Sequence, residues 1–365
     1  ASESASSDAN AADMHGFVRA FDLLGRELWT HQVSTSQDAL ASGLALGDAG
    51  VIYVVGGTFG SLGGQNAGGA DGFVLALDRD GRELWTHQVG TSQDDVASGL
   101  AVGDAGVIYV AGQTRGSLDG ENAGGADGFV RALDRQGREL WTSQFGTGVN
   151  ERVQSIVVAD DGAIYVAGGK FVLEGNHDED GEVFVRAFDR EGGEIWTYQT
   201  SPREGDWIGS LRIGMDVNAA GVIYLAGFND FQLQGGRSFG QGDGFVRALD
   251  SQGRELWNHQ FGIGKTGWVW SVTADDAGTI YVVGSTHGSL GGANAGESDG
   301  FVRAFNEQGR ELWMTQFGTS ADDYAGYVAV DDAGAIYVAG ETKGSWGGAS
   351  SGGEDAFVHR ILPSD

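Results

Sequence analysis

The sequence predicts an all-β fold, a β-propeller of four-stranded antiparallel blades, because one unit of about 56 residues recurs along the chain. The composition agrees, since 65 Gly against 2 Pro and 41% apolar residues indicate a turn-rich β protein. Helical periodicity and helix caps are absent. Each unit opens with Phe-Val, followed in six copies by a Trp twelve residues later and then by Ile-Tyr. The Phe residues are Phe17, Phe73, Phe129, Phe184, Phe245, Phe301 and Phe357, and the Trp residues are Trp29, Trp85, Trp141, Trp196, Trp257 and Trp313.

Each unit divides into four short strands. FVRALD (129–134) alternates apolar and polar residues and ends in a tight DRQG turn before RELWTSQF (138–145). In the preceding unit, ASGLAV (97–102) and the apolar run VIYVAG (107–112) are joined by a GDAG turn. The small ASGLAV segment suits the innermost position beside the channel, so we expect the order A (ASGLAV), B (VIYVAG), C (FVRALD) and D (RELWTSQF). The long Gly-rich loops then lie on one face of the ring.

Counting strands predicts six blades, with seven as the alternative. There are six A, six B and six D strands but seven C strands. We expect the last blade to take A and B from the C-terminal region and D from the N-terminal region, which would close the ring and protect its sheet edges. Its C strand is either 17–22 or 357–362, and the sequence does not distinguish them.

Composition also limits the partners. We expect residues 1–13 to form a flexible polar tail and residues 14–365 to form one propeller domain. The net charge of −29 argues against nucleic acid, since phosphate binding needs clusters of Lys and Arg. No apolar run is long enough to cross a bilayer, so direct membrane insertion is not expected. The absence of Cys excludes disulfides, and a polar start without Met is compatible with a mature exported protein, at the cell surface, in the periplasm or outside the cell.

Two family resemblances attach to these units. The segment 318–340 followed by GGEDAFV (352–358) resembles the SBBP repeat of bacterial surface and secreted proteins. That resemblance covers residues 14–362 and implies a seven-bladed propeller, from which our count of six departs, and it implies no defined activity. The segment 76–85, ALDRDGRELW, is similar to the tryptophan-docking motif of PQQ-like propeller repeats, one residue shorter at the turn. It implies that each Trp packs between blades, and without a vicinal Cys pair or a ligand set it implies a scaffold, not a quinone-dependent enzyme.

Acidic residues recur in the loop between strands D and A. If the fold is right they ring one mouth of the channel, where their oxygens suit a hard cation such as Ca²⁺, which is the only cofactor that the sequence suggests. The alternative, which we favour, is that each carboxylate accepts backbone N–H groups within its own turn. The candidate cation ring comprises Asp38, Asp94, Asp95, Glu151, Asp206, Asp322 and Asp323.

The units diverge between residues 149 and 270, mainly in the long loops. This sector adds aromatic and Arg residues to an otherwise acidic chain, and such residues are preferred at binding hot spots. Simple drift of an old repeat is the alternative explanation. The candidate binding residues are Arg152, Phe171, Arg203, Trp207, Phe228, Phe231, Arg237, Trp268 and Trp270.

The sequence therefore predicts a non-catalytic binding or scaffold propeller that recognises a protein partner through the long-loop face of this sector. A lectin that uses the same aromatic side chains on glycans is the alternative. A Ca²⁺-dependent hydrolase or lyase comes third, because no catalytic motif is present.

Overall fold

The computed structural model describes residues 14–174, 177–200, 213–229, 243–264, 267–331, 333–346 and 352–362. The predicted tail, 1–13, lies outside them. The described residues form strands and two short 3₁₀ turns, η1 (Asp48–Gly50) and η2 (Asp104–Gly106), and no α-helix. The strands of the first half are β1 (Gly16–Phe21), β2 (Glu27–Val33), β3 (Ala39–Leu46), β4 (Ile52–Thr58), β5 (Asp71–Leu77), β6 (Glu83–Val89), β7 (Asp95–Val102), β8 (Ile108–Thr114), β9 (Asp127–Leu133), β10 (Glu139–Phe145), β11 (Asn150–Val158) and β12 (Ile164–Glu174). The strands of the second half are β13 (His177–Phe188), β14 (Glu194–Gln199), β15 (Gly214–Val217), β16 (Ile223–Asn229), β17 (Asp243–Leu249), β18 (Glu255–Gly262), β19 (Gly267–Ala274), β20 (Ile280–Thr286), β21 (Asp299–Phe305), β22 (Glu311–Phe317), β23 (Asp323–Val330), β24 (Ile336–Thr342) and β25 (Asp355–Ile361).

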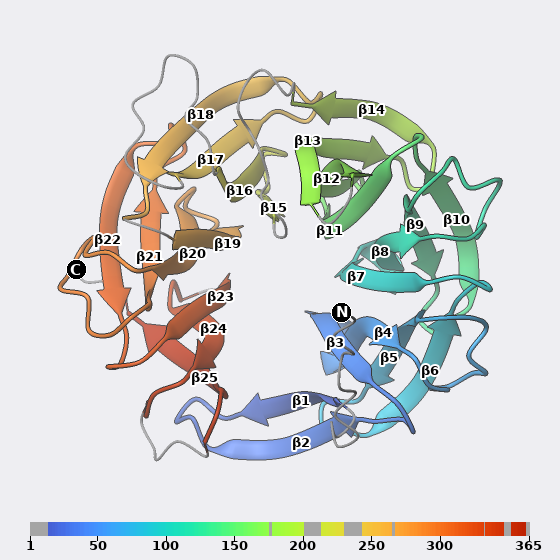
Figure 1. The fold of residues 1–365 in the computed structure, drawn as a ribbon, viewed down its shortest axis with the longest axis horizontal. Helices are drawn as coiled ribbons and strands as arrows, with labels where there is room; N and C mark the ends of the chain where they lie inside the picture. Colours follow the sequence, from blue (N-terminus) through green and yellow to red (C-terminus); the bar gives the residue numbers. More distant parts are fainter. Residues whose placement is uncertain are drawn as a thin grey trace, which may run out of the picture.

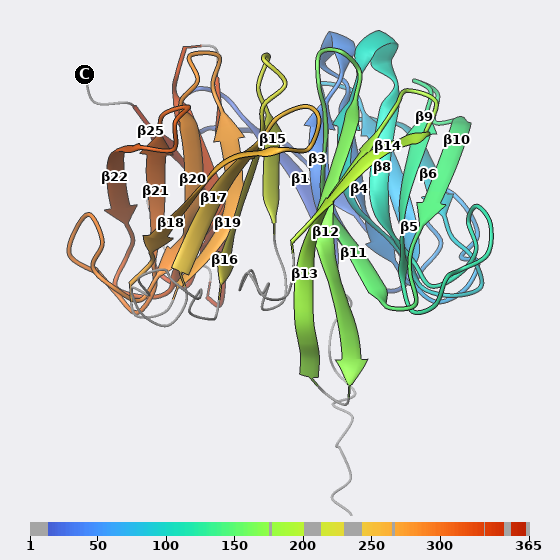
Figure 2. The ribbon, with the colours of Figure 1, turned by 90° about the horizontal axis from the view of Figure 1, so that it is seen from above.

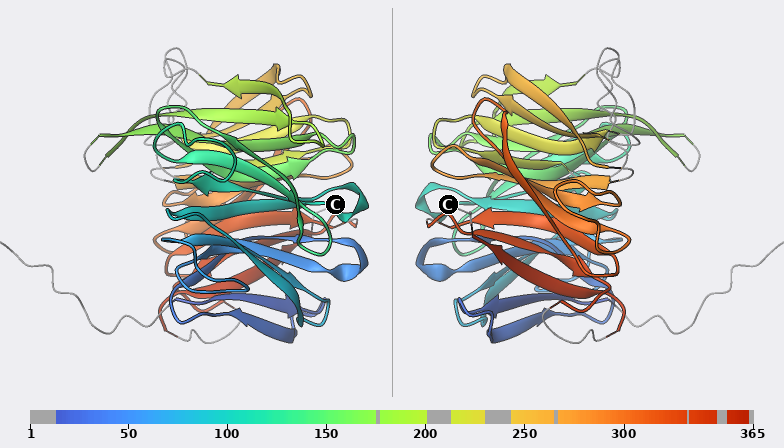
Figure 3. Two further views of the ribbon diagram at one scale, coloured as in Figure 1. Left: turned by 90° about the vertical axis from the view of Figure 1, so that its right-hand side faces the viewer. Right: turned by 90° about the vertical axis from the view of Figure 1, so that its left-hand side faces the viewer.

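These strands form a β-propeller, as the sequence predicts. Six antiparallel sheets stand around a centre, each headed by an inner A strand: β3, β7, β11, β15, β19 and β23 (Figure 1). Blades one to five are β3–β6, β7–β10, β11–β14, β15–β18 and β19–β22, and blade six is the three-stranded sheet β23–β25. The order within each blade is A, B, C, D from the centre outwards. Side views show the strands running from one face of the ring to the other (Figure 3).

The inner strands owe their shape to a bulge beside a glycine. In blade two the pairing of β7 with β8 shifts between Ala97 and Gly99, and Gly112 lies opposite Ala97. A Cβ on Gly112 would lie 1.9 Å from the carbonyl oxygen of Val96, so only glycine allows the two backbones to approach this closely. The same shift recurs in β3, β11, β19 and β23. The bulge strengthens the local twist of the innermost strand.

The hydrophobic core lies between neighbouring blades. Tyr53 and Val55 of blade one pack with Leu100 and Ile108 of blade two, and the other junctions repeat the pattern. The recurrent Trp of strand D joins the blades, as expected. The Nε1–H of Trp141 in blade two donates to the carbonyl oxygen of Arg190 in blade three at 2.9 Å. Corresponding bonds from Trp29, Trp85, Trp196 and Trp257 bridge four further junctions.

The pairing does not show the predicted sharing of one blade between the termini. Strand β25 takes the C position of blade six, whereas β1 pairs with β2 in a separate two-stranded sheet. Both candidate C strands are therefore present. The hairpin packs against blade one instead, since Val18 and Val33 join the cluster of Val54 and Phe73.

The divergent sector departs from the common unit in two places. Strands β12 and β13 extend well beyond the ring as a two-stranded arm that replaces the long B–C loop of blade three (Figure 2). Strand β15 has 4 residues, where the A strands of the other blades have 8 or 9.

Candidate binding face

Three predicted binding residues meet on β16, the second strand of blade four, and β19, the innermost strand of blade five. Trp268 and Trp270 are two residues apart on β19, and their rings stack with centroids 6.2 Å apart and planes at 16°. Phe228, at the end of β16, contacts Trp270 edge-on at 6.4 Å and is buried. Both Trp residues are half-buried, so they keep accessible aromatic surface while blade four holds them in place.

Two residues that the sequence did not suggest complete this aromatic cluster. The ring of His287, which is exposed, lies 5.6 Å from that of Trp268, and Tyr324 on β23 of blade six lies 6.5 Å from it. Tyr324 occupies in β23 the position that Trp268 occupies in β19. The unit around Tyr324 follows the common repeat, so divergence from the repeat could not indicate it. We name Phe228, Trp268, Trp270, His287 and Tyr324 the aromatic cluster.

Charged groups border the cluster at blade six. Lys343 pairs with Asp322 at 3.1 Å, and the hydrogen bond to that carboxylate raises the pKa of Lys343. Burial raises the pKa of Tyr324, and the charge of Asp322 raises it further. The Tyr324 hydroxyl therefore stays neutral at physiological pH and can donate a hydrogen bond to a ligand.

A second predicted group lies in blade three. The guanidinium of Arg152, on β11, lies 4.6 Å from the centre of the Phe171 ring at the base of the arm. Next to it, the Nζ of Lys170 lies 4.0 Å from Glu151, which is fully buried. The structure thus brings Arg152 and Phe171 together, and Trp268, Trp270 and Phe228 together. Arg203, Trp207, Phe231 and Arg237 lie outside the described residues.

The described members of the candidate cation ring accept hydrogen bonds from groups in the loops. Asp38 and Asp94 accept backbone N–H groups of Met14 (2.6 Å) and Ala70 (3.1 Å) in the loop of the preceding repeat. Asp95 and Asp323 accept the N–H and hydroxyl of the Thr four residues before them. Across the described part of the chain, no group of three or more His, Cys, Asp or Glu side chains could hold a metal ion. Asp206 is outside that part, so the complete ring stays a prediction.

The junctions between neighbouring blades also hold pairs of buried carboxylates. Asp71 with Asp95, Asp127 with Glu151, and Asp299 with Asp323 each join the start of a C strand to the start of the next A strand, and all are at most 1% exposed. One oxygen of each has no hydrogen-bond partner among the described residues. Burial raises the pKa of Asp95, to which the charge of Asp71 adds, and burial likewise raises that of Glu151.

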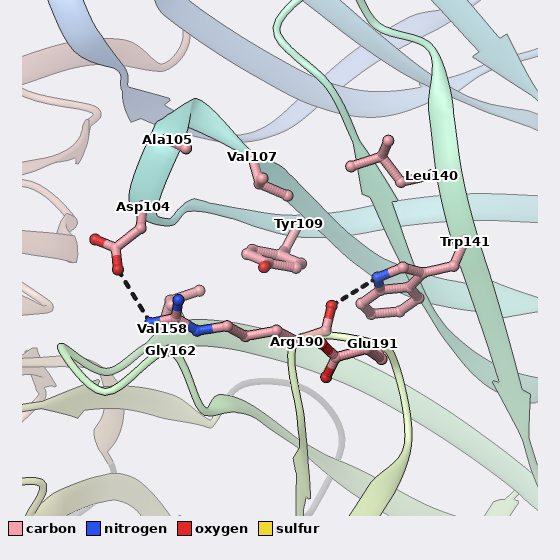
Figure 4. A pocket seen from close by; sticks show the side chains of 10 residues that line it. All are labelled: Asp104, Ala105, Val107, Tyr109, Leu140, Trp141, Val158, Gly162, Arg190 and Glu191. Atoms are coloured by element: carbon pink, nitrogen blue, oxygen red, sulfur yellow. Dashed lines mark hydrogen bonds and ion pairs between the residues drawn. The ribbon is translucent and has the colours of Figure 1, made fainter.

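A cavity of about 350 Å³ lies between blades two and three (Figure 4). Tyr109 and Trp141 form its aromatic wall, with ring centroids 6.0 Å apart, and the ion pair of Arg190 with Asp104 at 3.0 Å spans it. The corresponding Trp bond and Arg135–Asp48 ion pair recur at the junction before it. The cavity therefore follows from the way blades dock, and it carries no feature unique to this site.

Comparison with known proteins places part of the chain in a repeat family. Residues 312–345, from β22 to the loop after β24, match the family of SBBP β-propeller repeats. The match covers one repeat unit of the chain. The propeller architecture of the described residues agrees with a match to a β-propeller repeat, whereas the resemblance to PQQ-like repeats stays an expectation.

Regulatory protein FlaEY of Caulobacter vibrioides is 27% identical over 376 residues, an alignment that covers 86% of this chain. The chain spans 37% of the length of that relative. Among solved structures, polysaccharide lyase Uly1 has a TM-score of 0.54 at 11% identity, covering 96% of this chain and 85% of that one. The β-propeller domain of the Trilobed protease from Pyrococcus furiosus has a TM-score of 0.48 at 10% identity and covers 89% and 81%. At 11% identity the similarity to polysaccharide lyase Uly1 shows the fold alone.

Proposed function

We propose that this chain is a non-catalytic binding module that recognises a protein partner through the aromatic cluster and the Arg152–Phe171 pair of blade three. The observation that carries the proposal is that two stacked, half-buried Trp rings are held on the innermost strand of blade five beside an exposed His and a half-buried Tyr. Trp, Tyr and Arg dominate binding hot spots, which form where rigid aromatic groups keep accessible surface.

Other features support a binding role. The first relative compared is a regulatory protein, and the matched SBBP unit is a propeller repeat. The described His residues do not gather with carboxylates into a group that could hold a catalytic metal. The net charge of −29 favours a partner with a basic surface, since complementary charge speeds association.

The test is affinity capture from a lysate of the native source with immobilised protein. Trp268→Ala and Trp270→Ala should each weaken capture of a stoichiometric partner about thirtyfold, which corresponds to a hot-spot loss of about 2 kcal/mol. Leu84→Ala is the matched control, because Leu84 is a large apolar residue, 52% exposed, on the outer strand β6. The Leu84→Ala variant should capture the partner as well as the wild type does. Thermal melts should show that all three variants fold.

Two results would contradict the proposal. Equal capture by the Trp variants and the wild type would mean that the partner binds elsewhere. Retention of a glycan on an array, lost in Trp268→Ala and without any protein partner, would assign the same aromatic surface to carbohydrate stacking instead.

A further inference from the structure

Two of the blade junctions each hold a pair of buried Asp side chains with one unpartnered oxygen apiece. At the junction of blades one and two the pair is Asp71 and Asp95, and at the junction of blades five and six it is Asp299 and Asp323. All four side chains are at most 1% exposed. Within the described residues, Oδ1 of each accepts no hydrogen bond. A buried ionised carboxylate without a partner is costly, so each pair requires a group that compensates its charge.

The other oxygen of each carboxylate is held in place by two donors. At the junction of blades one and two, Oδ2 of Asp71 accepts the backbone N–H of Ala67 (2.8 Å) and the side-chain amide of Gln88 (2.9 Å). Oδ2 of Asp95 accepts the backbone N–H (2.5 Å) and the hydroxyl (2.8 Å) of Thr91. The junction of blades five and six repeats all four hydrogen bonds. Because two donors fix each carboxylate, its Oδ1 atom also has a fixed direction.

A glycine keeps space free beside the unpartnered oxygens. A Cβ on Gly90 would collide with Oδ1 of Asp71, and a Cβ on Gly318 would collide with Oδ1 of Asp299. The Cβ on Gly318 would also lie 3.1 Å from Oδ2 of Asp323, so the two carboxylates of this junction face one point. The glycine thus leaves room for a small group between the carboxylates.

A third junction shows what kind of group compensates such a pair. Between blades two and three the pair is Asp127 and Glu151, and the Nζ of Lys170 lies 4.0 Å from Glu151. Thr114 and Thr342 occupy the strand position of Lys170 in blades two and six. The chain therefore supplies a positive charge at one junction and a neutral hydroxyl at the other two.

The carboxylates are not needed to dock one sheet on the next. Where the β1–β2 hairpin meets blade one, His15 and Ala39 occupy the positions of the pair, and Ser34 occupies that of the glycine. The backbone N–H of Ala39 still donates to the carbonyl oxygen of Met14 at 2.9 Å, and the corresponding bond at the junction of blades one and two is 2.7 Å. At this junction the acidic pair and the glycine are absent together, so both belong to a feature other than docking.

We propose that the junction of blades one and two and the junction of blades five and six each bind one hard divalent cation, of the calcium class, between the two carboxylates. Two carboxylates supply two negative charges and the oxygen ligands that Ca²⁺ prefers, and neutral oxygens complete such sites. Only two acidic side chains are needed, which agrees with the lack of larger acidic groups in the described part of the chain. The sites share Asp95 and Asp323 with the candidate cation ring, but the second carboxylate comes from the C strand of the preceding blade.

The charges around the first pair agree with this assignment. In the cation-free protein, burial and then the charge of Asp71 raise the pKa of Asp95. Arg131, whose guanidinium interacts with the charge of Asp95, forms its ion pair with Glu139 at 3.3 Å. A bound cation would offset the cost of ionising both members of the pair.

The test combines calorimetry with thermal melting of the full chain after dialysis against EDTA. Ca²⁺ at about 1 mM should raise the melting temperature by several degrees, because a ligand that prefers the native state stabilises it. Calorimetry should count two ions per chain. Asp71→Asn and Asp299→Asn should each reduce the count to one, and the double variant should bind none. Each substitution removes a buried charge, so both variants should melt no lower than the wild type in EDTA.

Asp127→Asn is the matched control, because Asp127 has the same position at the junction where Lys170 supplies the positive charge. This variant should still bind two ions. The proposal is wrong if the wild type binds no Ca²⁺ and melts at the same temperature with Ca²⁺ and with EDTA. Two ions retained in the double variant would also overturn it, since Ca²⁺ would then bind elsewhere on the chain. So would an equal rise in melting temperature in NaCl of the same ionic strength, which would reduce the effect to screening of the net charge of −29.

Discussion

The buried carboxylates at the blade junctions make stability depend on pH. Burial raises the pKa of Asp95, so the folded state holds this proton more tightly than the unfolded chain does. For an acid with a raised pKa, the free energy of unfolding falls as the pH rises from the ordinary value, about 3.9, through the raised value. Ionised Asp95 therefore lowers the free energy of unfolding. This destabilisation is complete only above the pKa of Asp95 in the folded state, and it disappears in acid.

We predict that Asp95→Asn removes this dependence. As the pH rises from about 4 towards neutrality, the free energy of unfolding of the Asp95→Asn variant should increase relative to that of the wild type. Urea denaturation at several pH values measures this difference. Asp250→Asn is the control of opposite sign. Backbone N–H donation from Arg254 lowers the pKa of Asp250, so this carboxylate stabilises the wild type above its ordinary pKa and loses that effect in acid. Parallel profiles for the two variants would contradict the assignment.

A second prediction at this scale concerns the Trp that joins the blades. Trp141→Phe keeps an aromatic ring beside Tyr109 but removes the bond to the carbonyl oxygen of Arg190, and we expect a loss of about 1 kcal/mol in unfolding free energy. Trp141→Ala should cost more, because it also removes the ring. Leu140→Ala, at a neighbouring residue that is 53% exposed, should change stability little. Equal values for Phe and Ala at position 141 would mean that ring packing contributes nothing.

At the scale of the strand, the glycines opposite the bulges decide how closely A and B strands approach. Gly112→Ala places a Cβ against the carbonyl oxygen of Val96, and we expect a loss of about 1–3 kcal/mol, as for overpacked cores. Gly148→Ala is the matched control, since a Cβ there meets no atom within 4 Å and its φ is not positive. Chemical denaturation of both variants measures the difference. A neutral Gly112→Ala would show that the bulge can relax.

The strands themselves follow from the sequence, because period-two alternation and glycine turns act locally. That is why the strands could be predicted from the sequence, whereas the Trp contacts between blades were an expectation from the family resemblance. The closing blade could not, since counting strands does not show which edges pair. Phe17 and Phe357 open the same motif, yet Phe17 is 50% exposed and Phe357 is 8% exposed, and only the packing of whole sheets distinguishes them.

The candidate binding face could be predicted only in part, for a similar reason. Divergence from the repeat suggested Trp268, Trp270, Phe228, Arg152 and Phe171 as candidates, but it could not indicate Tyr324, which lies in a regular unit and contacts Trp268 across a blade boundary. From spacing alone, the sequence predicts that Asp95 belongs either to its own turn or to a cation ring. The structure adds that Asp95 is buried against Asp71, a relation between strands of different blades.

At the scale of the whole molecule, the ring presents two distinct faces. The turn face carries the repeated Trp docking and Arg–Asp ion pairs, such as Arg190 with Asp104. The opposite face carries the arm formed by β12 and β13 (Figure 2) and the Arg152–Phe171 contact at its base. A rigid ring with one regular and one divergent face suits a module that holds a partner in a fixed orientation.

The most direct measurement is cross-linking mass spectrometry of the protein with its captured partner. We predict that cross-links concentrate on the long-loop face, at Lys343 and at Lys170 beside the arm, and that they disappear with Trp268→Ala. Cross-links confined to the turn face or to the outer strands, and retained in that variant, would contradict it.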